Sequence, residues 1–195
     1  MAPNTIGLII ILISTLVGYY FYSKNMLFGE TKPNLVSWFI WMLAPFLGFF
    51  FAFKAGAGLS NLPVFIAGLG PLIVLLISVF KKNGYWKINS FDLICGLFSL
   101  IALAFYAFTK NLSISILFVI IADGLAGMPT IIKAWNFPKS ETSILYASGT
   151  LNQVVGLLAI KNWIFPIYSL NIYFILINLA IILSIYRKKI TPIFS

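Results

Sequence analysis

The chain has 195 residues, of which 61% are hydrophobic and only 9% are charged. A soluble domain carries about 25% charged residues, so this composition excludes an ordinary soluble protein and predicts an all-α integral membrane protein. The formal net charge is +9. Because the basic residues lie between apolar segments, we expect them to orient the chain in a membrane rather than to bind nucleic acid. With no histidine and only four acidic residues, we expect no enzymatic activity, cofactor or metal site.

Seven segments are apolar and close to the length of about 20 residues that a membrane-spanning helix needs. In chain order they are Thr5–Tyr22, Asn34–Phe53, Leu59–Phe80, Ser90–Phe108, Leu112–Lys133, Ser143–Ile160 and Trp163–Tyr186. The first residues lack the basic region of a signal peptide, and no clear cleavage site follows, so the first segment is expected to be retained. Residues 1–195 are therefore expected to form one domain of seven transmembrane helices.

The basic residues also predict an orientation. Ten lie in the first, third and fifth connections and the C-terminal tail: Lys24, Lys32, Lys81, Lys82, Lys87, Lys133, Lys139, Arg187, Lys188 and Lys189. Only Lys54, Lys110 and Lys161 lie on the opposite side. By the positive-inside rule, the N-terminus faces outwards and the C-terminus faces the cytoplasm. The abundance of Ile, Asn, Lys and Phe is associated with AT-rich bacterial genomes, so the expected location is a bacterial inner membrane.

The predicted segments form two similar halves. A shift of about 108 residues places the last three segments on the first three and, for example, Tyr146 on Trp38. We therefore expect residues 1–80 and 111–187 to form two three-helix repeats, joined by a linker helix within residues 88–110. Because the linker is a single helix, the repeats are parallel, and transporters commonly bind their solute at such a repeat interface.

Asp123 is the most informative single residue. It lies near the middle of Leu112–Lys133, where a carboxylate costs about 2.5–3.5 kcal/mol on insertion scales. Lys133 lies ten residues further along, about 15 Å along a helix axis, so this segment places no cation at the depth of Asp123. Burial disfavours the charged form, which makes Asp123 a candidate proton carrier or a binding group for a cation or an amine. A hydrogen-bonded lock between helices is the alternative.

Five further side chains are candidates for a solute-binding site: Thr15, Trp41, Asn152, Gln153 and Asn178. Adjacent helical residues point about 100° apart, so we expect either Asn152 or Gln153 to face a cavity and the other to face a helix. Hydrogen bonding between helices is the alternative role. Trp41 offers a ring face for stacking, with membrane-interface anchoring as its alternative. The 108-residue shift places Thr15 on Asp123, so the two are expected to face one another.

Two prolines mark candidate gating positions, Pro45 in the second segment and Pro129 in the fifth. Pro129 leaves the carbonyl of Leu125 without its helical partner, close to Asp123, which is one way to create a ligand-coordinating oxygen. An ordinary helix kink is the alternative for both prolines.

The other acidic residues are expected to lie outside any site. Asp92 follows Ser90 at the start of the fourth segment, where negative charge meets the helix dipole favourably. Glu141 lies beside Lys139 in a connection, and we expect it to be a solvated surface charge.

The fifth segment and the connection after it resemble the PQ-loop superfamily, specifically its seven-helix SWEET-type members. The resemblance rests on residues 123–135, DGLAGMPTIIKAW, and on Lys139-Ser140. Pro129-Thr130 stands where that family has Pro-Gln, and the first half has Tyr-Tyr-Phe at residues 19–21 instead. The family's paired midplane asparagines are matched only by Asn178. The resemblance implies a 3+1+3 helix arrangement and a carrier of small solutes such as sugars.

These features together predict a membrane transporter for a sugar or another small polar metabolite. It would work by alternating access between the two halves, with Asp123 as a possible point of proton coupling. A receptor or complex subunit without transport activity is the alternative, favoured by the missing proline motif in the first half. The expected partners are the solute and the lipid bilayer, and a homo-oligomer remains open.

Overall fold

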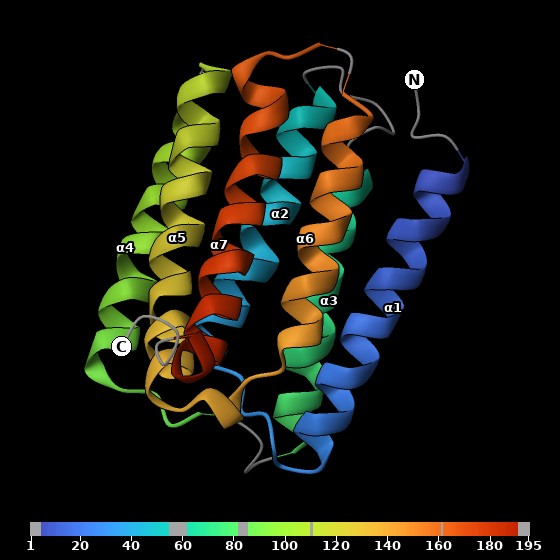
Figure 1. The fold of residues 1–195 in the computed structure, drawn as a ribbon. Helices are drawn as coiled ribbons and strands as arrows, with labels where there is room; N and C mark the ends of the chain where they lie inside the picture. The colour runs from blue at the N-terminus through green and yellow to red at the C-terminus, as the bar shows by residue number, and fades with distance from the viewer. Residues whose placement is uncertain (1–4, 55–61, 82–85, 110, 161, 191–195) are drawn as a thin grey trace.

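The computed structural model describes residues 5–54, 62–81, 86–109, 111–160 and 162–190. Within these ranges the chain forms seven α-helices, one short 3-10 helix and no strand. The elements are α1 (Thr5–Leu27), α2 (Leu35–Lys54), α3 (Leu62–Phe80), α4 (Ser90–Phe108), α5 (Leu112–Asn136), η2 (Pro138–Ser140), α6 (Ser143–Leu158) and α7 (Phe165–Ile190). Successive α-helices run in opposite directions along one bundle (Figure 1). We call the end at which α1, α3, α5 and α7 finish the basic end.

The predicted all-α class is confirmed, and each predicted segment corresponds to a helix. α4 has the predicted bounds, whereas α1 continues to Leu27 and α5 to Asn136. The predicted start of the third segment, residues 59–61, lies outside the described residues. Among the described residues, α1, α5 and α7 are long and apolar enough to cross a membrane. α2, α3 and α4 contain shorter apolar stretches.

Side chains at the helix starts explain where two helices begin. The side-chain oxygen of Asn34 accepts hydrogen bonds from the backbone N–H groups of Val36 and Ser37, at 3.1 and 3.3 Å. At α4, Asn89 and Asp92 each accept a hydrogen bond from the other's backbone N–H at 3.0 Å, which is a capping box. Asp92 therefore lies where its charge complements the helix dipole.

Helix packing places a shared interior between the first three and the last three helices. α2 packs on α3, and α7 packs on both α6 and α5. Across the two groups, α1 packs on α6 and α2 packs on α5. α4 packs on α5 and α2, at one edge of the bundle (Figure 1). Trp41 of α2 contacts all three clusters of buried apolar side chains, so it lies near the centre of this interior.

Candidate functional site

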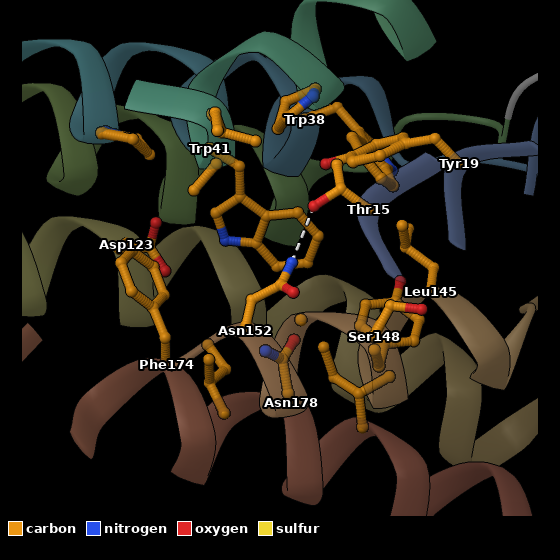
Figure 2. Close-up of a pocket in the computed structure, with 18 residues that line it drawn as sticks. Thr15, Tyr19, Trp38, Trp41, Asp123, Leu145, Ser148, Asn152, Phe174 and Asn178 are labelled. Atoms are coloured by element: carbon orange, nitrogen blue, oxygen red, sulfur yellow. Dashed lines mark hydrogen bonds between the residues drawn. The ribbon is translucent and has the colours of Figure 1, made fainter. Parts of the chain in front are cut away.

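A cavity of about 120 Å³ lies between α1, α2 and α3 on one side and α5, α6 and α7 on the other. Its lining comes from these six helices and includes the first turns of α2 and α6, whereas no described residue of α4 belongs to it. Five aromatic rings and five polar side chains face it (Figure 2): Tyr19, Trp38, Trp41, Tyr146, Phe174, Thr15, Asp123, Ser148, Asn152 and Asn178. The structure therefore brings five of the six predicted solute-binding residues to one cavity.

Asp123 is buried, with 1% of its surface exposed, and it is only partly satisfied. Its Oδ2 accepts a hydrogen bond of 2.7 Å from the hydroxyl of Tyr173. Its Oδ1 is buried and has no hydrogen-bond partner among the described residues. The Trp41 indole lies beside Asp123 with its nitrogen on that side (Figure 2), but this N–H completes no hydrogen bond with a described residue. An unused acceptor and an unused donor therefore stand together at the cavity.

Asn152 connects α6 to α1 at the cavity wall. Its Nδ2 donates a hydrogen bond of 2.8 Å to the Thr15 hydroxyl (Figure 2), and its Oδ1 accepts one from the Ser14 hydroxyl. Thr15 is thus paired with Asn152 rather than with Asp123, although both Thr15 and Asp123 line the cavity. Much of the hydrogen-bonding capacity of Asn152 is already used between the helices.

The two adjacent carboxamides of α6 point in different directions, as expected. Asn152 lines the cavity, whereas Gln153 is buried and does not belong to the lining. Gln153 lies one helical turn after Gly149, and a side chain at Gly149 would collide with the amide of Asn178, whose Nδ2 would lie 2.8 Å from the added Cβ. Gln153 therefore lies on the side of α6 that packs on α7, outside the predicted site.

The two predicted gating prolines also differ in position. Pro45 lines the cavity, together with Pro71 of α3. Pro129 is buried but lies outside the lining, between Asp123 and the basic end. Its neighbour Thr130 donates a hydrogen bond of 3.1 Å to the Ser37 hydroxyl, which joins α5 to α2.

Glu141 is not the solvated surface charge that its sequence position predicts. It is only 7% exposed, its Oε1 lies 2.5 Å from the Lys133 Nζ, and its Oε2 accepts a hydrogen bond of 2.9 Å from the Tyr146 hydroxyl. Lys133 also donates to the backbone carbonyl of Lys32. The short helix η2 turns the connection back over the end of α5, and this turn brings Glu141 against Lys133.

The connection after α1 is hydrogen-bonded to the connection after α5. The hydroxyls of Thr31 and Thr142 lie 2.6 Å apart, and the Asn25 Nδ2 donates to the Thr142 hydroxyl at 3.0 Å. The backbone N–H of Lys32 donates to the Ser140 carbonyl at 3.2 Å. We call the bonded residues the basic-end network: Asn25, Thr31, Lys32, Lys133, Ser140, Glu141, Thr142 and Tyr146. This network ties the two groups of helices together at one end of the bundle.

Sequence reasoning missed several aromatic residues at or beside the cavity. Tyr173, which holds Asp123, and Phe174 stand in a chain with 17% aromatic residues, where no single ring stands out. One signal was available for Tyr19. A Cβ added at Gly70 of α3 would lie 1.6 Å from the Tyr19 Cζ, so Gly70, next to Pro71, provides the space for this ring.

Within the described residues, no three His, Cys, Asp or Glu side chains are grouped so as to hold a metal ion. No protein-family model, curated protein or solved structure matches the chain. The function is therefore argued from the geometry of the cavity and of the basic-end network.

Proposed function

We propose that this chain is an integral membrane protein whose seven α-helices all cross the bilayer. Its composition, the three long apolar helices and the outer faces of the bundle support this proposal. Large apolar side chains such as Leu16, Phe98 and Leu183 are more than half exposed, and extended apolar surfaces of this kind are costly in water. The asymmetry of basic residues supports a cytoplasmic C-terminus, and we assign the protein to a bacterial inner membrane.

Within that membrane the protein is proposed to transport a small solute by alternating access between two three-helix halves, α1–α3 and α5–α7. The observation that carries this proposal is the cavity, because both halves line it at mid-depth around a buried, half-satisfied acid. Transporters built from repeats place their solute site at the repeat interface near the midplane. A lining without charge, or from one half alone, would give much weaker support.

The helix contacts support a repeat related by an approximate two-fold axis. Exchanging the halves maps α1 onto α5 and α2 onto α6, so the contact of α1 with α6 becomes that of α5 with α2, and both are observed. α4, the proposed linker, lies outside the cavity. The pairs related by the 108-residue shift, Thr15 with Asp123 and Trp38 with Tyr146, all line the cavity.

The basic-end network supplies the reversible closure that alternating access needs. It joins the connection within one half to the connection within the other, so the halves must separate there before a solute can pass. The hydrogen bonds that cross between the halves are several, and a typical one contributes about 0.5–1.5 kcal/mol. The Lys133–Glu141 ion pair lies within one half and does not have to break when the halves separate. A closure made of such bonds can open and close again without unfolding either half.

Asp123 is the proposed point of contact with the solute, and it is also the proposed point of any proton coupling. A sugar or another small polar metabolite is the substrate class that the SWEET-type resemblance implies. Catalysis is not part of the proposal, because Asp123 is the one acid among the described lining residues and no nucleophile–base pair of described residues stands beside it.

Alternating access can be tested without knowing the solute, because the chain has one cysteine, Cys95, which is buried in α4 outside the lining. In a Cys95→Ala background, Ser148→Cys places a near-isosteric thiol at the cavity. Ser99→Cys is the matched control, since Ser99 is fully buried in α4 and outside the lining. A membrane-impermeant thiol reagent is then applied to intact cells and, separately, to inside-out vesicles.

We expect the cysteine at position 148 to react from both sides of the membrane and the cysteine at position 99 to react from neither. Reaction from one side only would contradict transport and favour the alternative, a receptor or complex subunit with a one-sided pocket. Reaction from neither side would show that the cavity is sealed interior space and would overturn the proposal.

A further inference from the structure

We propose that the cavity binds a small organic cation, an ammonium compound that also carries an oxygen acceptor such as a hydroxyl group. This inference rests on the proposed function, because it names the substrate class of the same cavity. It departs from the neutral sugar that the SWEET-type resemblance implies.

The charges around the cavity favour a cationic occupant. Among the described residues, Asp123 is the only ionisable acid or base in the lining other than tyrosine, and none of the described lysines and arginines belongs to it. Lys133, the buried cation on the same helix, is paired with Glu141 and hydrogen-bonded to Lys32. A buried carboxylate without a cation carries an uncompensated desolvation cost. A positively charged solute would supply the missing charge.

The unused hydrogen-bonding groups specify the ligand further. Asp123 Oδ1 completes no hydrogen bond with a described residue, and the Trp41 Nε1–H is turned towards Asp123 without completing one. An ammonium group would take the place of this N–H at the carboxylate, and an oxygen atom a few bonds away in the ligand would accept a hydrogen bond from the N–H instead. Asn152 contributes less, because Ser14 and Thr15 already occupy it.

The aromatic lining favours an ammonium group over other cations. The Trp41 ring lies between Asp123 and Asn152 (Figure 2), and the Trp38 ring packs against it edge to face, with centroids 5.5 Å apart. Tryptophan faces attract organic ammonium groups through the ring quadrupole, most strongly where water is excluded. A bare metal ion would instead need several oxygen ligands around one point, and Asp123 is the only carboxylate in the lining.

The test compares choline with 3,3-dimethylbutan-1-ol, which has the same shape and hydroxyl group but a neutral carbon in place of the ammonium nitrogen. Ethanolamine, glucose and sodium chloride at equal ionic strength complete the panel. The purified protein is melted with each compound, since a ligand that binds the folded state raises the melting temperature. The same compounds are tested for protection of the cysteine at position 148 from thiol reagent.

We expect choline or ethanolamine to raise the melting temperature and to slow labelling, and we expect the neutral alcohol, glucose and sodium to do neither. Asp123→Asn keeps an acceptor for Tyr173 but removes the charge, so affinity for the cation should fall by about tenfold or more. Trp41→Leu should weaken binding of the cation. Its melting temperature without ligand measures separately the packing lost at the three apolar clusters that Trp41 contacts. Asp92→Asn is the matched control, because this buried acid caps α4 outside the cavity, and it should leave affinity unchanged.

The inference is overturned if neither ammonium compound binds, if the neutral alcohol or glucose binds as well as choline, or if sodium alone reproduces the effect. It is also overturned if Asp123→Asn and Asp92→Asn behave alike. Its failure differs from failure of the proposed function. Labelling from both sides without cation binding would support the proposed transport but not the proposed ligand. Cation binding with labelling from one side only would support the ligand and indicate a receptor rather than a transporter.

Discussion

Asp123 and Glu141 are two buried carboxylic acids in one chain, and they differ in what surrounds them. Glu141 has Lys133 at 2.5 Å on one oxygen and the Tyr146 hydroxyl at 2.9 Å on the other. Asp123 has only the Tyr173 hydroxyl, and its second oxygen faces the cavity region without a partner among the described residues. Burial is nearly the same, at 1% exposed for Asp123 and 7% for Glu141, so burial alone does not distinguish a site from a lock.

The difference teaches that the partners of a buried acid indicate its role. A fully paired acid contributes to one packing arrangement, and removing either partner leaves a charge that the surrounding side chains do not satisfy. An acid with an unpartnered oxygen beside a cavity can instead bind a ligand reversibly. This contrast supports the proposed assignment of Glu141 to the closure of the bundle and of Asp123 to the solute site.

The largest expected effect comes from removing the cation of the paired acid. Lys133→Met leaves Glu141 buried without its counter-charge, and breaking such a pair costs about 3–5 kcal/mol of folding free energy. Unfolding of the purified variant in detergent measures this loss. In the double variant Lys133→Met/Glu141→Leu, most of the stability should return, because neither charge remains. A double variant as unstable as Lys133→Met would show that the pair itself is not the source of the cost.

A smaller loss of stability is expected when single hydrogen bonds are removed, and its size should differ between the basic-end network and the cavity. Thr142→Val removes the hydroxyl that Thr31 and Asn25 share. This leaves the buried Thr31 hydroxyl and the half-buried Asn25 amide without that partner, at a cost of about 1–3 kcal/mol. Thr15→Val is the matched substitution at the cavity, where water can replace the lost contact with Asn152, so we expect less than about 1 kcal/mol. Equal losses in unfolding measurements would mean that the cavity is as dry as the basic-end network.

The tyrosines that hold the two acids sharpen the comparison further. Tyr173→Phe removes the hydrogen bond of 2.7 Å from the Tyr173 hydroxyl to Asp123, and we expect a loss of about 0.5–1.5 kcal/mol. Tyr146→Phe removes a similar bond, but Glu141 keeps Lys133, so its loss should lie at the lower end of that range. Paired unfolding measurements decide the order, and a larger loss for Tyr146→Phe would contradict it.

The smallest expected change in stability belongs to the residue with the largest expected role in binding. Asp123→Asn keeps an oxygen for Tyr173 and removes an uncompensated charge, so the unfolding free energy should change by less than about 0.5 kcal/mol or rise. Glu141→Gln, the equivalent amide substitution, should instead destabilise the protein because Lys133 loses its counter-charge. If Asp123→Asn were the more destabilising of the two, Asp123 would be a structural lock.

The helices could be predicted from the sequence because apolar runs of sufficient length leave little alternative. Asp123, Asn152 and Trp41 could be identified because polar or amphipathic side chains within apolar segments need a reason to be there. Thr15 was found through the repeat. In each of these cases the information lies within one helix or in a fixed sequence shift.

The rest depends on how helices meet. The bond from Tyr173 to Asp123 requires the register between α7 and α5, which no local pattern encodes. Glu141 reads as a surface charge because it stands beside Lys139 in a connection, and only the turn through η2 directs it towards Lys133. Gln153 is a second example of what the sequence does not predict. The rotation of α6 about its axis decides that Asn152 rather than Gln153 lines the cavity.

α5 carries Asp123 at the cavity and Lys133 in the basic-end network, with Pro129 between them. Proline has no N–H to donate to the carbonyl four residues earlier, so α5 can bend there without breaking a backbone hydrogen bond. The proposed solute contact and the proposed closure thus lie on the same helix, on opposite sides of this bending point. Bending of α5 at Pro129 would therefore couple solute binding at Asp123 to opening of the basic-end network.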